Sequence, residues 1–504
     1  MPDPVTTLRP GATVRWFLLA SLIVLGAQLS SPFNAWAQEE ESEVQMDRFE
    51  EECAEGAEEE EHGEEGSRLS DHCRPLAEIP PRPRPLIELG EPFLGTGTLG
   101  DGFKIPGGAV WQPSLVAFGS LRTALQGGNF RANGVELVEA VTRLDLFGNL
   151  YLTQTERILI GFRPLDEDGQ FTGYTLRARP TEFAEEDFES FENFDITTLF
   201  MEGDLAELFP FLDSQDRRGL DVYFGVGRQP VAFQDGLLLN ENAMDMVGLT
   251  RANMKLGSVV NARVTAAFGW GEVNRHGGGA NVPDEAAKLF GMFWEIDRRR
   301  STWEIDAVYV ASDDVSGNGV YVGIGDIRRI GKYNNTLRVL ASFPAGDETP
   351  FNQQGVLIHN QLSWTPYHNH NLWYVNTFAG INHFRSAARG PSSGGPVGQL
   401  GILFAAPGIG RLGAPLGNEV DQSVGGAIGY QAFLADTRQQ VVLEAGGRYR
   451  LSDEALNTNS VGGGIRYQAA MGRRFVFVVD GFGTWDNDFE EVNFGGRTEL
   501  LLKF

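Results

Sequence analysis

The stretch from Gly496 to Phe504, GRTELLLKF, decides the fold class of this chain. Successive side chains of a β-strand point to opposite faces, so this segment has two different faces. The first face is largely apolar and consists of Thr498, Leu500, Leu502 and Phe504. The second face is largely charged and consists of Arg497, Glu499, Leu501 and Lys503. Such a strand needs an apolar environment on one side and a polar one on the other.

The same two-residue period recurs toward the N-terminus for nearly 400 residues. Clear examples are the segments 138–146, 260–270 and 441–450, and tryptophans such as Trp270 and Trp485 lie near segment ends. A soluble β-sandwich would also alternate. The sustained repeat, the tryptophans and an export signal instead favour a transmembrane antiparallel up-and-down β-barrel, apolar toward lipid and polar toward its lumen. Closure also removes the exposed sheet edges.

Composition excludes two other classes. The 504 residues include 63 glycines and 34 phenylalanines, and the net charge is −27. A protein that binds a nucleic-acid backbone needs a basic surface, so this class is excluded. The mean hydropathy is −0.21, and the only long apolar run lies near the start, so a helical membrane protein is excluded too.

Residues 1–37 are expected to be a secretory signal peptide. Arg9 and Arg15 precede the apolar run 16–29, and the A-x-A cleavage pattern follows at positions 35–37. The run is too short to span a bilayer, although an uncleaved anchor is the alternative. The mature chain is therefore expected to begin at Gln38, in an oxidising compartment.

Residues 38–78 are expected to form an acidic, disordered periplasmic extension, and residues 79–108 a Pro/Gly-rich linker. Positions 39–65 hold 15 acidic residues and one arginine, with too few apolar residues for a core. Cys53 and Cys73 could close one disulfide. Free thiols, or a loose metal site with His62 and His72, are the alternatives. The barrel is expected to occupy residues 109–504.

Short and long connections alternate along this barrel region. Short turns are expected at 298–301, 331–334, 435–438 and 471–473, and long loops at 271–286, 385–421 and 451–460. Barrels of this kind have short periplasmic turns and longer extracellular loops. The pattern contains 19 candidate strands, and bacterial barrels have even numbers. The error must lie before about Leu220, among segments 136–152, 157–163 and 172–178, so 18 strands are predicted, with 16 as the alternative.

The face opposite the apolar one is expected to line the pore. The predicted basic lining residues are Arg143, Arg157, Arg163, Arg177, Arg263, Arg448, Arg450, Arg466 and Arg497. The predicted acidic lining residues are Glu295, Asp297, Glu304 and Asp306. Most of the basic residues lie on the first and last strands, which are neighbours in a closed barrel. A basic wall is therefore expected to face an acidic one and to orient charged solutes. Alternatively, these charges pair with their strand neighbours and only keep the lumen polar.

One segment resembles the alginate-export outer-membrane family. Its residues are Gly227, Arg228 and Gln229, then Asp235 and Gly236, then Asp245 to Leu249. The match covers about 30 residues. The resemblance implies a signal-bearing, monomeric barrel with an arginine-rich lumen that conducts anionic polysaccharide. The loop from Pro230 to Asn242, which contains the apolar run GLLL, and the acidic residues from Glu295 to Asp306 depart from the family pattern.

The predicted function is passage of a polar or anionic solute across the outer membrane of a Gram-negative bacterium, by porin-type diffusion or polysaccharide export. The alternative is a structural or adhesion barrel whose loops close the lumen. No enzyme activity, cofactor, metal or nucleic acid is expected. The expected partners are outer-membrane lipid and lipopolysaccharide, the solute, and the insertion machinery, which in this class recognises a terminal aromatic such as Phe504. The chain is expected to be a monomer.

The segment from Gly408 to Gly413 formally matches GxGxxG. A dinucleotide site would require a strand before it and a helix after it, but Pro407 and Pro415 flank this segment. We therefore expect residues 385–418 to form an extracellular loop or an inward-folded constriction.

Overall fold

The computed structural model describes residues 84–90, 102–130, 135–153, 155–167, 169–178, 188–211, 221–255, 257, 259–277, 280–314, 316–366, 369–397, 400–435, 437–452, 458–488 and 490–504. The signal peptide and acidic extension predicted for residues 1–78, with Cys53 and Cys73, lie outside this part of the chain. In the described part, no helix is long and apolar enough to cross a membrane.

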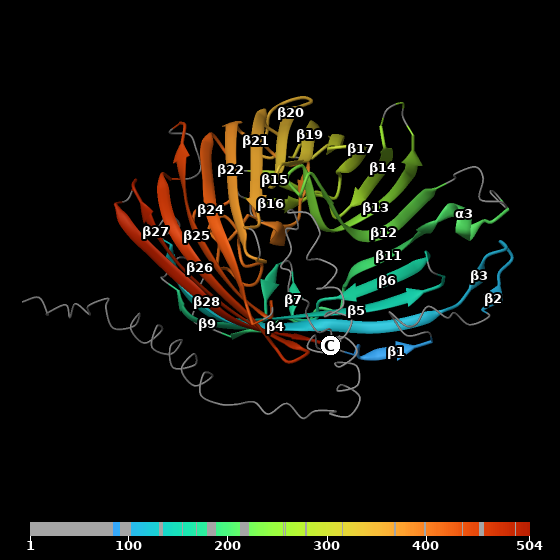
Figure 1. Cartoon of the computed structure of the whole chain (residues 1–504), viewed down its shortest axis with the longest axis horizontal. Coiled ribbons are helices and arrows are strands. Elements are labelled where there is room, and N and C mark those ends of the chain that lie inside the picture. Colours follow the sequence, from blue (N-terminus) through green and yellow to red (C-terminus); the bar gives the residue numbers. More distant parts are fainter. Residues whose placement is uncertain are drawn as a thin grey trace, which may run out of the picture. The chain divides into compact units, whose positions relative to one another are not determined.

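The described chain forms a closed antiparallel barrel of 18 strands (Figure 1). In order around the ring the strands are β4 (Ser114–Phe130), β5 (Val135–Tyr151), β6 (Arg157–Phe162), β11 (Ile196–Asp204), β12 (Val222–Phe233), β13 (Leu239–Met254), β14 (Asn261–Gly271), β17 (Lys288–Arg298), β18 (Ser301–Ala311), β19 (Gly319–Ile330), β20 (Tyr333–Pro344), β21 (Gly355–Trp364), β22 (Leu372–Asn382), β24 (Ser423–Leu434), β25 (Gln439–Arg450), β26 (Ser460–Met471), β27 (Phe475–Asp486) and β28 (Glu491–Lys503). This confirms the predicted fold class and strand number.

The first and last strands close the ring. Strand β28 pairs with β4 from Gly495 opposite Gly128 to Lys503 opposite Ser120. Phe504 continues the ladder, because its backbone exchanges hydrogen bonds of 2.8 and 3.1 Å with Gly119. A Cβ atom on Gly119 would lie 2.7 Å from the ring of Phe504, so this position accommodates the ring only as glycine.

The odd strand count has a structural explanation. Strands β6 and β9 (Gly173–Ala178) are two halves of one barrel strand, since both pair antiparallel with β5, at Leu146–Tyr151 and at Leu137–Val141 respectively. The next position is likewise shared by β10 (Phe188–Glu189) and β11. The chain leaves the ring between β6 and β9 to form the small hairpin of β7 (Asp166–Glu167) and β8 (Gln170–Phe171). Segments 157–163 and 172–178 are therefore one interrupted strand.

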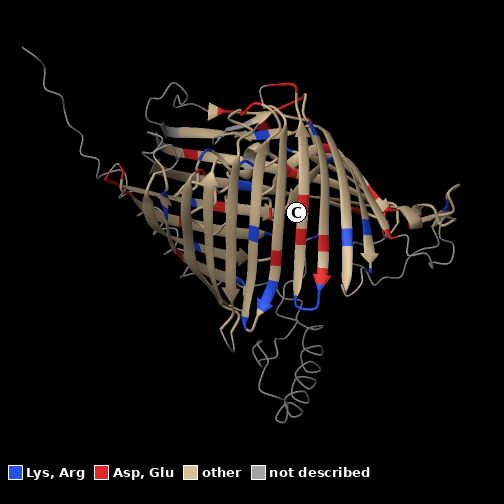
Figure 2. Ribbon diagram, turned by 90° about the horizontal axis from the view of Figure 1, so that it is seen from above, with Lys and Arg blue, Asp and Glu red and all other residues tan. Residues whose placement is uncertain are grey.

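The outward face carries the apolar residues of the alternation. Examples with two-fifths or more of their surface exposed are Phe290, Met292, Ile324, Val339, Ile428, Leu443, Ile465 and Leu500. They come from strands distributed around the ring, from β17 to β28. Charged residues interrupt the strands only at intervals along the ribbon (Figure 2). Such a band around a closed barrel is the surface that faces lipid.

Turns and loops separate to the two ends of the barrel. Only 299–300 joins β17 to β18, and only 331–332 joins β19 to β20, whereas residues 272–287 and 383–422 form long connections at the opposite end. The former contains the hairpin β15 (Asn274–Gly277) and β16 (Ala280–Pro283), and the latter contains β23 (Ala388–Arg389) and the 3-10 turn Pro391–Ser393. These connections match the predicted alternation of short and long. Others do not, because 205–221 between β11 and β12 is long at the turn end and 487–490 between β27 and β28 is short at the loop end.

Short elements extend the barrel near its N-terminal strand and at one turn. β1 (Ile87–Leu89) pairs with Leu115–Ala117 of β4, and β2 (Phe103–Lys104) pairs with β3 (Val110–Trp111). The residues expected to be a linker thus include paired backbone. Helix α3 (Leu205–Leu208) is a single turn, capped by the side chain of Asp204, which accepts a hydrogen bond from the backbone N–H of Ala206.

Candidate functional site

The connection His383–Gln422, here called the inward loop, crosses the interior of the ring. Its residues Phe384, Leu403 and Phe404 are at most 1% exposed and pack with inner-face residues of β17 to β22. The same loop also contacts β4 and β5, on another part of the wall, where Gln126 Nε2 donates to the carbonyl of Ile409. Contacts with such different parts of the ring require the loop to lie inside it. Of the two alternatives expected for this segment, an extracellular loop or an inward-folded constriction, the described residues show the second.

The inner face of the middle strands is apolar near the loop end. A buried apolar cluster lies there, and the strand residues that form it are Leu289, Phe293, Val308, Val310, Tyr321, Leu340, Leu357 and Phe378. A simple alternation predicts polar residues there, because the interior is expected to be wet. The inward loop and the β12–β13 turn (Leu237, Leu238) instead supply apolar side chains that cover them. Burial against the loop removes this surface from water and stabilises both.

Glu444 on β25 anchors the middle of the inward loop. Its carboxylate accepts hydrogen bonds from the backbone N–H groups of Ile402 (3.0 Å) and Leu403 (2.8 Å), and from the hydroxyl of Tyr374. Gly401 adopts φ +60°, and a Cβ there would lie 1.7 Å from Glu444 Oε2. Only glycine fits the turn that brings these two N–H groups to the carboxylate.

A second anchor fixes the GxGxxG segment to β4 and β5. The N–H of Arg411 donates to Glu139 Oε1 at 2.6 Å, and Gln126 Nε2 donates to the same carboxylate at 2.8 Å. Gly410 has φ +67°, and a Cβ on it would lie 2.4 Å from both Gln126 and Glu139. The glycines of this segment thus permit close approach to the barrel wall. Pro407 lies beside it and accepts from Arg122 and Arg497 at 3.4 Å.

Buried charges hold the two ends of the loop. Arg385 pairs with Asp421, and both side chains are at most 3% exposed. Arg448 on β25 donates to the carbonyls of Leu416 (2.8 Å) and Glu419, and to Ser423 Oγ (3.0 Å). Arg448 is therefore a buried anchor of the loop, in contrast to the water-facing role that the sequence suggested.

Most of the predicted basic residues on the first and last strands form ion pairs. Arg143 and Arg163 share Asp145, at 2.9 and 3.1 Å, whereas Arg466 and Arg497 share Asp480, both at 2.7 Å. Arg122, which the sequence analysis did not select, pairs with Glu499 at 2.8 Å, and Arg497 reaches the same carboxylate at 2.9 Å. This wall thus alternates cations and anions, and the carboxylates were the missed partners.

The other basic residues lie farther from this cluster. Arg157 pairs with Glu202, and Arg450 lies 3.5 Å from Asp488. The backbone of Arg177 belongs to β9, and its side chain lies outside the described residues. Arg263 pairs across strands with Glu295, and its side chain is half exposed.

The predicted acidic residues all lie on inner-face positions of β17 and β18, as the exposure of their neighbours shows. Besides the Glu295 pair, Asp297 accepts from Thr302 Oγ1 at 2.8 Å, Glu304 pairs with Arg338 at 3.0 Å, and Asp306 accepts from Gln234 Nε2 at 2.7 Å. Arg338 and Gln234 were missed, the first because it is a single arginine among apolar residues of β20. Gln234 belongs to a turn that folds inward, which alternation cannot reveal.

The GRQ segment forms a cross-strand pair. Arg228 on β12 lies opposite Asp245 on β13 and binds both carboxylate oxygens, at 2.8 and 2.9 Å. Gly227 has φ +123°, and a Cβ there would lie 2.2 Å from the carbonyl of Leu199. The side chain of Gln229 lies over Gly225. Asp235 and Gly236 form the turn that folds inward, where Asp235 pairs with the buried Arg338.

The β7–β8 hairpin fills another part of the interior. Phe171 packs with Ala124, Val141 and Ile409, so it connects the wall to the tip of the inward loop. Burial raises the pKa of Asp166 above its ordinary value, although Arg163 and Arg143 oppose this. The hairpin and the part of the inward loop around Ile409 therefore pack together against β4 and β5.

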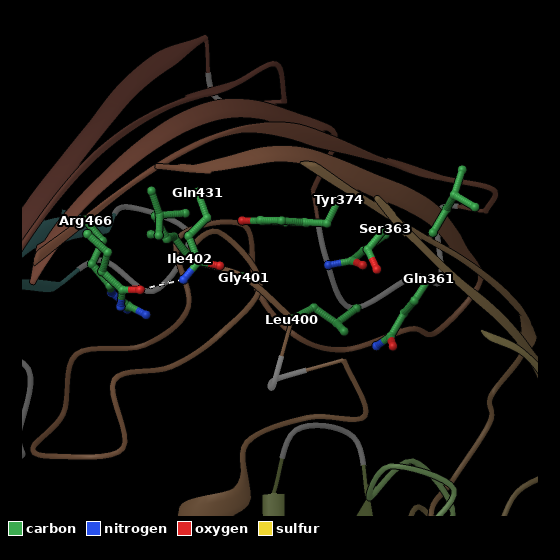
Figure 3. Close-up of a pocket in the computed structure, with 12 residues that line it drawn as sticks. Gln361, Ser363, Tyr374, Leu400, Gly401, Ile402, Gln431 and Arg466 are labelled. Carbon is green, nitrogen blue, oxygen red and sulfur yellow. Dashed lines mark hydrogen bonds between the residues drawn. The ribbon is translucent and has the colours of Figure 1, made fainter. Parts of the chain in front are cut away.

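A polar cavity of about 370 Å³ remains between the inward loop and β21 to β26. Its polar lining consists of Gln361, Ser363, Tyr374, Asn376, Gln431, Gln440 and Arg466. Leu400, Gly401 and Ile402 of the inward loop lie over it, with Arg466 at one end of the labelled row and Gln361 at the other (Figure 3). This cavity is the candidate solute site.

No family model and no curated protein match the chain. Solved structures do match it. A BenF-like porin from Pseudomonas fluorescens Pf-5 has a TM-score of 0.53 and 9% identity, over 77% of this chain and 98% of that chain. Pseudomonas aeruginosa OccK2 (OpdF) has a TM-score of 0.50 and 10% identity, over 80% and 99% of the two chains. Its complex with glucuronate has a TM-score of 0.50 and 9% identity, over 77% and 98%.

At these identities the likeness concerns the fold alone. The comparisons give no support to the alginate-export resemblance. The chain has the closed 18-strand barrel fold of outer-membrane porins.

Proposed function

We propose that this chain is an outer-membrane channel through which small polar solutes, anionic or sugar-like, diffuse without catalysis. The observation that carries the proposal is the inward loop, which narrows an 18-strand barrel but leaves a polar cavity of about 370 Å³ against the wall. Barrels of this size have room for side chains, loops and a passage. A protein of the same fold, Pseudomonas aeruginosa OccK2 (OpdF), has been solved in complex with glucuronate, which is a small polar solute.

The proposed setting is the outer membrane of a Gram-negative cell, with lipid and lipopolysaccharide around the apolar band. Phe504 is proposed as the element that the insertion machinery recognises, and the barrel is proposed to act as a monomer. The inward charges selected from the sequence are proposed to line the passage, apart from Arg448, which anchors the inward loop. Export of anionic polysaccharide, which the alginate-export resemblance implies, rests on Gly227 to Leu249 alone.

Planar-bilayer recording of the refolded full chain tests the channel. The expected result is stable KCl current, with partial block by a permeant solute. One observation favours the alternative of a structural barrel, namely the apolar cluster that fills the loop end of the interior. Complete absence of current from a barrel shown to be folded would establish that alternative and overturn the channel.

A further inference from the structure

We propose that the cavity under the inward loop binds a neutral polyhydroxylated solute, such as a monosaccharide, in preference to an anion. The inference rests on the proposed channel function and specifies its substrate class. It is carried by the chemistry of the lining residues, by the balance of charge around them, and by the apolar cover that the loop supplies.

Carboxamides dominate the lining. Gln361, Asn376, Gln431 and Gln440 come from four neighbouring strands, β21, β22, β24 and β25, and all four line the cavity. Each carboxamide offers two N–H donors and one carbonyl acceptor, so it can both give and receive hydrogen bonds. A sugar hydroxyl uses both capacities, whereas an ionised carboxylate only accepts.

Two of these amides, Gln431 and Gln440, form a hydrogen-bonded row with Gln468 on β26. Gln431 Nε2 donates to Gln440 Oε1, and Gln440 Nε2 donates to Gln468 Oε1 at 2.7 Å. Each of these NH₂ groups has a second N–H besides the one donated within the row. Ser363 and the hydroxyl of Tyr374 add further polar atoms to the same wall. A sugar ring carries several spaced hydroxyls, which can each bond to a member of such a row. An anion with a single charged group makes less use of it.

Among the described residues that line the cavity, Arg466 is the only cation, and it is already paired. Arg466 donates to both oxygens of Asp480, at 2.7 and 3.2 Å. The nearby Glu444 accepts from Tyr374 and from the loop backbone. Arg466 therefore faces two carboxylates, of which Asp480 is shared with Arg497. An anionic solute would find the guanidinium of Arg466 already paired and would have to compete with these carboxylates for it.

The loop supplies a complementary apolar surface. Leu400 and Ile402 lie over the cavity, and Val442 lies on its wall. Sugar rings present C–H groups on one face and hydroxyls around the rim, so a polar wall under an apolar cover fits them. The volume is within the roughly 300–1,000 Å³ of small-molecule sites.

The test compares entry of glucose and sodium gluconate into liposomes that contain the refolded full chain. These solutes are of similar size and differ in charge, and the comparison needs no substitution. The expected result is that glucose enters at least several-fold faster. Equal rates, or faster entry of gluconate, with KCl current present would overturn this inference and leave the channel function standing. Absence of KCl current from the folded barrel would sink both.

A double variant tests whether the lining amides produce the preference for glucose. The double substitution Gln431→Leu and Gln440→Leu is expected to lower the ratio of glucose to gluconate entry several-fold. Gln439→Leu is the matched control, since it is the same change on the adjacent residue of β25, which points to the opposite face. An unchanged ratio of glucose to gluconate entry in the folded double variant would place the selectivity elsewhere.

Discussion

The two ends of the barrel interior differ although the same strands form both. Along β21, Leu357 near the loop end is fully buried against the inward loop, whereas Gln361 and Ser363 near the turn end line the polar cavity. All three occupy inner-face positions of a strand with one period. The alternation therefore fixes which way a side chain points, and the inward loop decides whether that direction is dry or wet.

Deletion of the inward loop should have the largest effect on the contrast between the dry and the wet end of the interior. The two limbs of the loop meet where Val397 N donates to the carbonyl of Asn418 at 3.3 Å, so residues 398–416 can be replaced by two glycines. We expect KCl conductance to rise several-fold, because the constriction is gone. The barrel should also lose stability, since the apolar cluster becomes wet.

Single-channel recording and the gel mobility of heated and unheated protein would test this deletion. A folded deletion variant with the conductance of the full chain would mean that the loop does not limit the passage.

Gly401→Ala loosens the loop at one anchor. The new Cβ would overlap the carboxylate of Glu444, which must move away from the N–H groups of Ile402 and Leu403. A buried donor left without its partner costs roughly 1–3 kcal/mol. We therefore expect a lower melting temperature and noisier channel current.

Gly413→Ala is the control for this change, since nothing lies within 4 Å of a Cβ at that position in the same loop. Equal melting temperatures for the two variants would argue against the Glu444 anchor.

Arg497→Gln alters the charge of the wall. Asp480 and Glu499 would then share only Arg466 and Arg122, so the wall becomes more negative by one charge. One charge at about 8 Å in a water-like medium contributes roughly 0.5 kcal/mol, so the preference for K⁺ over Cl⁻ should rise about twofold.

The reversal potential in a KCl gradient measures this preference. Arg263→Gln is the matched comparison and should have less effect, because Arg263 is half exposed and its pair with Glu295 is screened. A shift toward Cl⁻ in the Arg497 variant would contradict the inward position of this residue.

The smallest expected effect concerns pH at the second end of the loop. Burial raises the pKa of Glu419, but His276, Arg385 and Arg389 more than offset this and lower it below its ordinary value. Because the folded pKa is depressed, the stabilisation is complete above the ordinary carboxyl range and is lost as pH falls through the folded value. His276 Nε2 lies 3.2 Å from Glu419 Oε1.

We therefore expect current noise to increase only in acid, below about pH 4.5, where the loop loosens. Glu419→Gln removes the titrating group and should flatten this dependence. The same acid response in the Glu419→Gln channel would assign it to another carboxylate.

The sequence predicted the barrel because its signal is local and repeated. Phe290 and Met292 pointed outward and Glu295 inward as the two-residue period requires. The strand count failed once and was corrected by parity, since nothing local shows that segments 157–163 and 172–178 continue one another across a hairpin. The pattern also predicted that Arg385 to Asn418 would be a loop.

The interior could not be predicted to the same depth, because its contacts join residues far apart in the chain. Asp145 and Asp480 each bind two arginines, and the alternation gives only their face. Arg448 lies on the inner face of β25, but the loop carbonyls it binds are specified by the path of the loop. The amide row of the cavity gave no sequence signal, since its members are single glutamines on separate strands.

The seam between β28 and β4 has a consequence for how the molecule folds. The pair Arg122–Glu499 bridges positions 377 residues apart, whereas the other wall contacts arise largely between consecutive hairpins. Bringing the ends of so long a chain together costs about 5 kcal/mol of entropy, against much less for a short turn. We therefore expect the hairpins to form early and the pairing of β28 with β4 to form last. Closure at this seam, including the Arg122–Glu499 ion pair, is then the rate-limiting step of assembly.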